Sequence, residues 1–245
     1  MHHGITDGYG QNREIIGNRV NSQVDWLDKV IVLLSGGIDS ATALYLTKKE
    51  TSEVFSLNFV YAQASIREAE TSQRLATEAK VREHITVSLP FFKEIQTRYR
   101  PQPTANITSA YVPARNIIFY GIAGAYAETL GARKIVFGSN AEDAKELPDA
   151  RPEFVRAANV LLAKGTRVGA GGNAIQVVNP LIESSKKEVL RLAIELNVPL
   201  ELTWSCHEDV ILPCHRCRGC VARHNAFKEI GMQDPLDLRL MSGHG

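Results

Sequence analysis

The chain of 245 residues has no cysteine before position 206 and none after position 220. It also has no apolar run close to the ~20 residues that a membrane-spanning helix requires. Residues 1–26 are polar and lack the apolar centre of a secretory signal. The sequence therefore predicts a cytoplasmic protein with no membrane partner.

An excess of charge of either sign is also missing. The 28 lysines and arginines are balanced by 27 aspartates and glutamates, which gives a formal net charge of +1. A chain whose main partner is a nucleic acid usually carries a clear basic excess. Nucleic acid is therefore not an expected partner, although a zinc-dependent nucleic-acid binder or a tRNA-thiolating enzyme stays as a less favoured alternative. Thiolation would need a reactive cysteine outside the single cysteine cluster.

Short apolar runs alternate with amphipathic helical patterns along most of the chain. Strands are expected at Val30–Leu34, Val54–Val60, His84–Leu89, Lys134–Gly138 and Ala174–Val178. Helices are expected at Ala41–Lys49, Ile66–Lys80, Asn116–Leu130, Glu153–Ala163, from Ser184 or Ser185 to about Leu196, and at Val221–Ile230. Such alternation predicts an α/β fold with a mostly parallel, Rossmann-like sheet flanked by helices. Gln96–Ser109 is polar and contains two prolines, which indicates a loop or an ordered lid.

The residue patterns along the chain suggest three parts. Residues 1–27 read as an N-terminal extension, 28–202 as a nucleotide-binding domain, and 203–245 as a small C-terminal module that contains the cysteines.

A loop of sequence SGGIDS, Ser35–Ser40, follows the first expected strand. In parallel sheets, ligands bind beyond the carboxyl ends of strands, and glycines let backbone N–H groups face an anion. The loop therefore predicts a phosphate site built from neutral groups. It has neither the lysine of a Walker loop nor the GxGxxG of a dinucleotide fold. Asp39 would repel phosphate unless a cation lies between them, which favours Mg²⁺; the alternative is a tight turn with Asp39 as a helix cap.

The four cysteines are spaced for a single metal site: Cys206, Cys214, Cys217 and Cys220. Four thiolates suit tetrahedral Zn²⁺ in a closed, structural site. An iron–sulfur cluster and four unliganded cysteines are the competing interpretations. His207 and His215 lie between the cysteines and are expected to face solvent or to support the ligands rather than bind the metal.

Several segments occur in an order typical of one enzyme family. They are SGGIDS, VPARN at 112–116, GSNA at 138–141, PDARPEF at 148–154, PLI at 180–182 with Lys186, and TWSC at 203–206. Together with the cysteine cluster, they make residues 28–230 resemble the 7-cyano-7-deazaguanine synthase family of the ATP pyrophosphatase (PP-loop) superfamily. The resemblance implies that ATP adenylates 7-carboxy-7-deazaguanine, that ammonia displaces AMP, and that a second ATP converts the amide into the nitrile. It also implies a homodimer.

The resemblance assigns residues to roles by motif position. For ATP binding they are Leu34, Ser35, Gly36, Gly37, Ile38, Asp39 and Ser40. For catalysis they are Asp39, Ser40, Arg115 and Lys186. For binding the substrate they are Tyr61, Gln63, Asn116, Asn140, Asp149, Arg151 and Glu153. For each charged residue the alternative is a surface salt bridge or a helix cap, and Glu153 could simply serve the first turn of its helix.

Three positions depart from the family pattern, which usually reads FDYGQ after the second strand and PDCRPEF later. Val60, Ala62 and Ala150 replace an acid, a glycine and a cysteine, respectively. These changes leave the phosphate loop intact and affect the substrate side. They keep open a divergent relative that stops at the amide or joins the activated acid to another amine, such as one on a protein. No glutaminase domain is visible, so ammonia would come from solution or from another protein.

Overall fold

The computed structural model describes residues 29–61, 66–98, 111–208 and 210–242. Within these residues, five strands form one parallel sheet in the order β3-β2-β1-β4-β5. The strands are β1 Val30–Leu33, β2 Val54–Val60, β3 Glu83–Ser88, β4 Lys134–Phe137 and β5 Gln176–Val178. The strand order changes direction at β1, so the carboxyl ends of β1 and β4 border the switch point where such sheets bind ligands.

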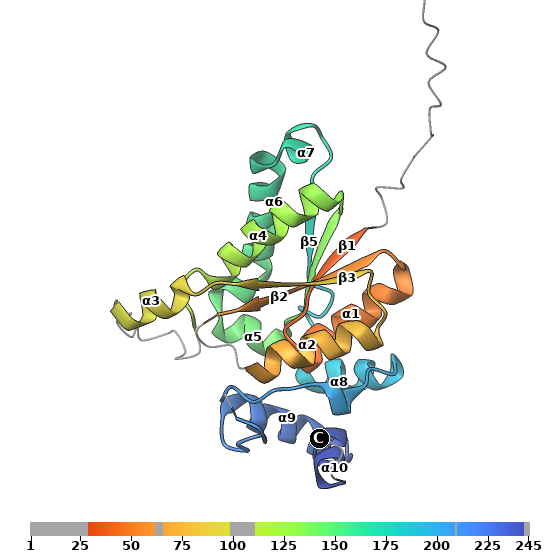
Figure 1. Ribbon diagram of the computed structural model, residues 1–245. Coiled ribbons are helices and arrows are strands. Elements are labelled where there is room, and N and C mark those ends of the chain that lie inside the picture. Colours follow the sequence, from red (N-terminus) through yellow and green to blue (C-terminus); the bar gives the residue numbers. More distant parts are fainter. Residues whose placement is uncertain (1–28, 62–65, 99–110, 209, 243–245) are drawn as a thin grey trace, which may run out of the picture.

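Helices cover both faces of the sheet (Figure 1). One face packs against α1 Ile38–Glu50, α2 Ile66–Glu78 and α8 Lys186–Glu195, and the other against α4 Arg115–Leu130 and α6 Pro152–Gly165. Successive side chains of a strand point to opposite faces. Accordingly, Val30 and Val32 join one core, and Ile31 and Leu33 join the other. Burial on both sides explains why the strand is continuously apolar in the sequence.

The described residues contain further helices. They are α3 Phe91–Arg98, α5 Ala141–Glu146, α7 Arg167–Ala170, α9 Arg218–Glu229 and α10 Pro235–Met241, with 3₁₀ turns η1 Pro148–Ala150 and η2 Leu200–Leu202. Figure 1 shows α9 and α10 together at one end of the molecule, beneath α8. We call residues 203–242 the C-terminal module from here on.

A buried arginine holds the C-terminal module together. The Arg223 side chain donates hydrogen bonds to both carboxylate oxygens of Asp234, at 2.5 and 2.8 Å. It also donates to the carbonyl of Leu200 at 2.9 Å and to the hydroxyl of Thr203 at 2.7 Å. Because every side of this guanidinium has a partner, a charge can be buried there at a tolerable cost.

The predicted fold class is confirmed, and the expected strands and long helices are present with shifts at their ends. Ser185 caps α8 and forms a capping box with Glu188, as predicted. The first helix was predicted too short, because it begins at Ile38 directly after the glycines.

The predicted loop at Gln96–Ser109 is wrong at its start, since α3 continues through Arg98. Positions 99–109 of that loop lie outside the described residues, as do Gln63, Ala62 and the extension at 1–27. The division of the chain at residue 203 stays a prediction.

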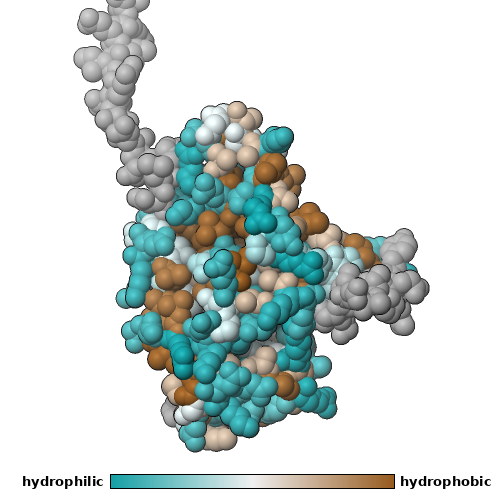
Figure 2. Space-filling model, turned by 180° about the vertical axis from the view of Figure 1, so that it is seen from behind, coloured by the Kyte–Doolittle hydropathy of each residue, from teal (hydrophilic) through white to brown (hydrophobic). Residues whose placement is uncertain are grey.

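None of the helices in the described part of the chain combines the length and the hydropathy that crossing a bilayer requires. The face seen in Figure 2 is mostly hydrophilic and carries hydrophobic residues in separate patches. Among the exposed large hydrophobic residues are Val160 and Leu161 on α6, each 55% exposed.

Candidate active site

The SGGIDS loop lies at the carboxyl end of β1 and leads directly into α1. Gly36 has a φ of +91°, and a Cβ there would lie 3.0 Å from both the carbonyl oxygen of Glu68 and a side-chain carbon of Thr71. Glycine is therefore required both by conformation and by space. Gly37 is the N-cap of α1 and makes no side-chain capping bond. The first N–H groups of α1 thus remain available to an anion at this point.

The two serines of the loop fix its shape from inside. The hydroxyl of Ser40 accepts from the N–H of Ser35 at 3.2 Å and donates to the carbonyl of Gly37 at 3.1 Å. The hydroxyls of Ser35 and Ser40 lie 3.1 Å apart. The carbonyl of Gly36 accepts from the N–H of Trp204 at 2.9 Å. The C-terminal module therefore contacts the loop through the backbone.

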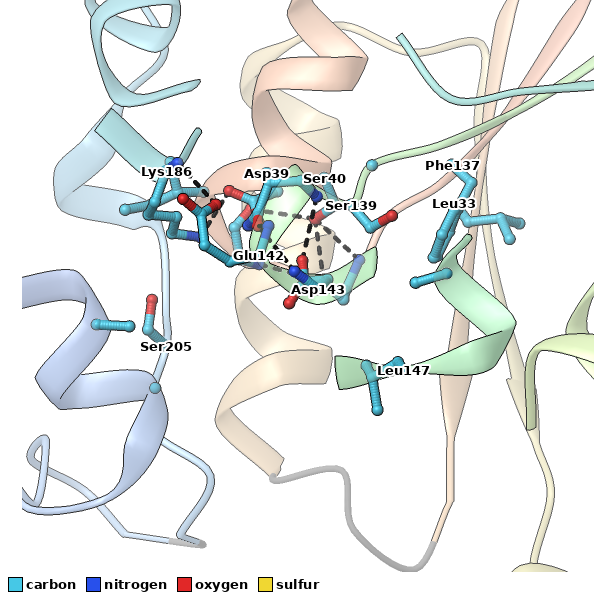
Figure 3. A pocket seen from close by; sticks show the side chains of 18 of the residues that line it. Leu33, Asp39, Ser40, Phe137, Ser139, Glu142, Asp143, Leu147, Lys186 and Ser205 are labelled. Carbon is cyan, nitrogen blue, oxygen red and sulfur yellow. Dashed lines mark hydrogen bonds and ion pairs between the residues drawn. The ribbon is translucent and has the colours of Figure 1, made fainter. Parts of the chain in front are cut away.

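Asp39 points from the start of α1 toward α5 and α8. Its Oδ1 lies 2.6 Å from Nζ of Lys186, and its Oδ2 accepts from the side-chain amide of Asn140 at 2.8 Å. Asn140 is the N-cap of α5 and forms a capping box with Asp143. Figure 3 shows Asp39, Glu142, Asp143 and Lys186 gathered beside Ser40.

This charge cluster is partly shielded from solvent. The side chains of Lys186 and Asp39 are 27% and 14% exposed. Burial, followed by the charge of Asp39, raises the pKa of Asp143. Glu142 accepts from the backbone N–H of Lys186 at 3.1 Å, which ties α5 to α8. The loop therefore has a lysine beside it that is supplied from a distant helix rather than from the loop itself.

Close approach of two elements positions this cluster. A Cβ on Gly138, at the end of β4, would lie 2.6 Å from the backbone oxygen of Asp39. Only glycine allows β4 and α1 to come this near. As a result, Asn140 reaches the Asp39 carboxylate.

An aromatic region adjoins the loop at the ends of β2 and α4. The rings of Phe59 and Phe119 stack with centroids 4.0 Å apart, and Tyr61 meets Phe119 edge-on at 5.5 Å. Arg115 donates to the Tyr61 hydroxyl at 3.0 Å and lies over its ring. Burial raises the pKa of Tyr61, and the nearby Arg115 opposes that rise. The region offers flat apolar faces with one cation beside them.

Asp149 lies behind this region and is 6% exposed. Neither of its carboxylate oxygens has a hydrogen-bond partner, and neither does the buried hydroxyl of Tyr120. Burial, together with the charge of Asp149, raises the pKa of Tyr120. The backbone carbonyl of Asp149 accepts from the side chain of Asn116 at 2.9 Å. A buried carboxylate without partners is costly to the fold and calls for a ligand or another function.

A cavity of about 1140 Å³ joins the loop, the charge cluster and the aromatic region. This volume is ample for two small reactants. Its lining includes the predicted residues Leu34, Ser35, Gly37, Ile38, Asp39, Ser40, Tyr61, Arg115, Asn116, Asn140 and Lys186.

Four other predicted site residues do not line the cavity: Gly36, Asp149, Arg151 and Glu153. Gly36 nevertheless belongs to the SGGIDS loop. Asp149 lies behind the lining, next to Ala150, which does line the cavity. Arg151 is exposed and donates to the carbonyl of Ala144 at 3.2 Å. Glu153 is exposed in the first turn of α6. Arg151 and Glu153 therefore do not line this cavity, and their role in substrate binding stays a prediction.

Other residues line the cavity without having been predicted. They are, among others, Asn58, Glu68, Glu142, Asp143, His207, Arg218, Asn225 and Glu229. His207 lines the cavity and is exposed, in line with the expectation that it faces solvent. Partial burial lowers its pKa, as do the charges of Arg218 and Arg115. On α9 the residues at 218, 222, 225 and 229 recur at helical spacing, which is the signal that could have revealed this wall.

The four cysteines come together in the C-terminal module. Their sulfur atoms all lie within 4.8 Å of one another, and two of the pairs are 4.0 Å apart. Tetrahedral Zn²⁺ with Zn–S bonds of about 2.3 Å requires sulfurs roughly 3.8 Å apart, so the donor set fits a metal ion. Backbone N–H groups donate to the sulfurs, and one of them, from Arg216, chiefly lowers the pKa of Cys214 to about 6. This favours the thiolate form of Cys214, whereas burial raises the pKa of Cys206 and of Cys220.

Comparisons with known proteins point to one family. Residues 29–231 match the family model described as "Queuosine biosynthesis protein QueC". The chain is 38% identical over 225 residues to the 7-cyano-7-deazaguanine synthase of Trichodesmium erythraeum, covering 85% of this chain and 99% of that protein. It is also 38% identical over 217 residues to the enzyme of the same name from Acetivibrio thermocellus, covering 85% and 97%.

Among solved structures, NMN synthetase from Francisella tularensis superposes with a TM-score of 0.49 at 18% identity, covering 86% of this chain and 84% of the other. A likeness at this level says nothing about activity.

Proposed function

Because the chain belongs to the queuosine biosynthesis protein QueC family, we propose that it makes 7-cyano-7-deazaguanine from 7-carboxy-7-deazaguanine, ATP and ammonia. The observation that carries the proposal is the loop at 35–40, whose backbone opens onto the same cavity as Arg115 and Lys186. A cavity with a phosphate loop at one end and flat aromatic walls at the other suits an adenylation reaction on a purine-like acid.

The reaction proceeds by two activations. A carboxylate oxygen of the acid attacks the α-phosphorus of ATP, and pyrophosphate leaves. Ammonia then attacks the carbonyl carbon, AMP leaves, and the surplus proton passes to solvent. The amide oxygen attacks a second ATP in the same way, and loss of AMP with two protons leaves the nitrile. The enzyme has to stabilise negative charge on the departing pyrophosphate in each activation.

The residues divide this work by position. The N–H groups at the start of α1 bind the pyrophosphate, and Ser40 holds the loop in shape. Lys186 moves its charge from Asp39 to the phosphates when ATP arrives. Arg115 orients the acid's carboxylate. Tyr61, Asn116 and Asp149 bind the deazaguanine ring, whose N–H groups suit the unpartnered carboxylate of Asp149.

Mg²⁺ enters with ATP as part of the substrate. In the described part of the chain, the cysteines are the one group of three or more potential ligands close enough for a single metal ion. Asp39 is engaged by Lys186 and Asn140, so a resting magnesium cage is not built from protein groups alone. Mg²⁺ commonly binds through one or two carboxylates plus substrate phosphates. Asp39 would supply that carboxylate.

The cysteine site holds structural zinc in this proposal. Cys206, Cys214, Cys217 and Cys220 complete four ligands and leave no open position for a reactant. The site ties the segment around Cys206 to the start of α9, beside the SGGIDS loop that Trp204 contacts. Cys217→Ser should release the metal, lower the melting temperature and make the C-terminal module more rapidly cleaved by proteases. Unchanged zinc content by elemental analysis would contradict this assignment.

The activity is tested with purified protein, 7-carboxy-7-deazaguanine, MgATP and ammonium, with products followed by mass spectrometry. The expected result is the nitrile with two AMP formed for each molecule. ADP instead of AMP would refute the proposal. Amide alone, or transfer of the acyl group to a protein amine, would support the divergent relative left open by Val60 and Ala150.

Asp39→Asn should abolish AMP formation while the melting temperature changes little. Glu195→Gln, an exposed carboxylate at the end of α8, is the matched control and should retain full activity.

A homodimer and a cytoplasmic location remain part of the proposal. Sedimentation of the purified protein tests whether it is a homodimer.

A further inference from the structure

One face of α9 borders the active-site cavity. Arg218, Ala222, Asn225, Ala226 and Glu229 all line it, at the spacing that places side chains on one side of a helix. The C-terminal module is therefore a wall of the site as well as a metal-binding appendage. Its small residues leave room in the cavity, and Arg218 at the first turn is the basic side chain it offers there.

Arg218 connects α9 to α5, whose residues Glu142 and Asp143 also line the cavity. Its guanidinium forms an ion pair with Glu146, the last residue of α5. The two side chains are 40% and 44% exposed, so the pair is accessible to solvent and to ligands. The charge of Arg218 also contributes to the electrostatic environment of His207 and Asp143. Arg218 thus lines the cavity and is at the same time open to solvent.

We propose that Arg218 binds an oxyanion of a reactant, exchanging Glu146 for a phosphate of ATP or for the carboxylate of the acid. This inference rests on the proposed function and adds a ligand-binding residue to it. A guanidinium presents paired donors that match two oxygens of a carboxylate or a phosphate. Because an ion pair this exposed contributes little to stability, a mere connection between α5 and α9 is a weak explanation for it.

Two other cations that line the cavity, Lys186 and Arg115, have different partners. Lys186 is paired with Asp39 beside the loop, and Arg115 donates to Tyr61 in the aromatic region. Arg218 comes from a third side and lies at the far end of α5 from Asn140. It can therefore meet an anionic group that neither of the others reaches.

The test measures binding by calorimetry to zinc-loaded protein, with α,β-methylene-ATP and Mg²⁺ in one arm and 7-carboxy-7-deazaguanine in the other. Arg218→Gln should lower the affinity for one of the two ligands about tenfold or more. The ligand whose affinity falls carries the oxyanion that Arg218 binds. Arg218→Lys should recover only part of the loss, because lysine keeps the charge without the paired donors.

Two variants separate ligand binding from a structural role. Glu146→Gln breaks the same ion pair but keeps the guanidinium, so it should bind the ligand as tightly as the wild type or more tightly. Arg216→Gln removes an exposed arginine of the same module that does not line the cavity, and it should change neither affinity.

The inference is overturned if Arg218→Gln retains both affinities, or if Glu146→Gln loses affinity to the same extent as Arg218→Gln. Zinc content and melting temperature are measured for each variant, so that a folding defect is recognised. Wild-type protein that binds neither ligand would instead refute the proposed function.

Discussion

Asp149→Asn should make the protein more stable and its binding of the acid weaker. The side chain is 6% exposed and both carboxylate oxygens lack hydrogen-bond partners. An unpaired buried charge opposes folding, whereas a neutral amide of the same size opposes it less. The substitution therefore removes a cost to the folded state without creating a cavity.

The expected magnitudes follow from the two roles. Relief of an unsatisfied buried group is worth about 1 kcal/mol or more, which for a chain of this size raises the melting temperature by roughly 2–4 °C. Hydrogen bonds to a charged group contribute about 1.5–3 kcal/mol, so losing one weakens binding of 7-carboxy-7-deazaguanine roughly 10- to 150-fold. Stability and affinity should thus change in opposite senses.

Calorimetry measures both quantities on the same preparation, by thermal unfolding without ligand and by titration with the acid. Glu195→Gln, the exposed carboxylate at the end of α8, is the control and should alter neither. The reasoning is refuted if Asp149→Asn melts at a lower temperature than the wild type and binds the acid equally well. In that case the carboxylate would have a structural partner.

Three further outcomes follow from individual contacts. Arg223→Met should cost about 3–5 kcal/mol of unfolding free energy, because it leaves the carboxylate of Asp234 buried without its cation; chemical denaturation measures this. Ala114→Gly should add about 1 kcal/mol to the free energy of unfolding, because Ala114 has a left-handed φ of 57° that glycine adopts without strain. A melting temperature below that of the wild type would contradict this prediction. Burial lowers the pKa of His84 below its ordinary 6.5. Protonation therefore opposes folding, and stability should fall as the pH drops through 6.5 and below. His84→Gln should lessen that fall, and identical pH profiles would show that the histidine is not responsible.

Local patterns made much of this structure predictable. The apolar run at Val30–Leu34 predicted a strand buried on both faces, and Ser185 with Glu188 predicted a capping box. These features depend on neighbours within a few positions, where chain geometry leaves little choice. The prediction failed where short elements are stabilised by contacts with distant segments, as in α5 and α10, which are too short to be stable alone.

The sequence by itself determined the SGGIDS turn between strand and helix, the alternating fold and the cysteine set, because each is encoded by residue types at fixed short spacing. Only the tertiary structure decided that Lys186 lies against Asp39, that Arg151 and Glu153 do not line the cavity, and that α9 forms one of its walls. Those outcomes depend on how helices far apart in the chain pack around one sheet. Periodicity tells which side of a helix is buried, but it does not tell which neighbour will cover that side.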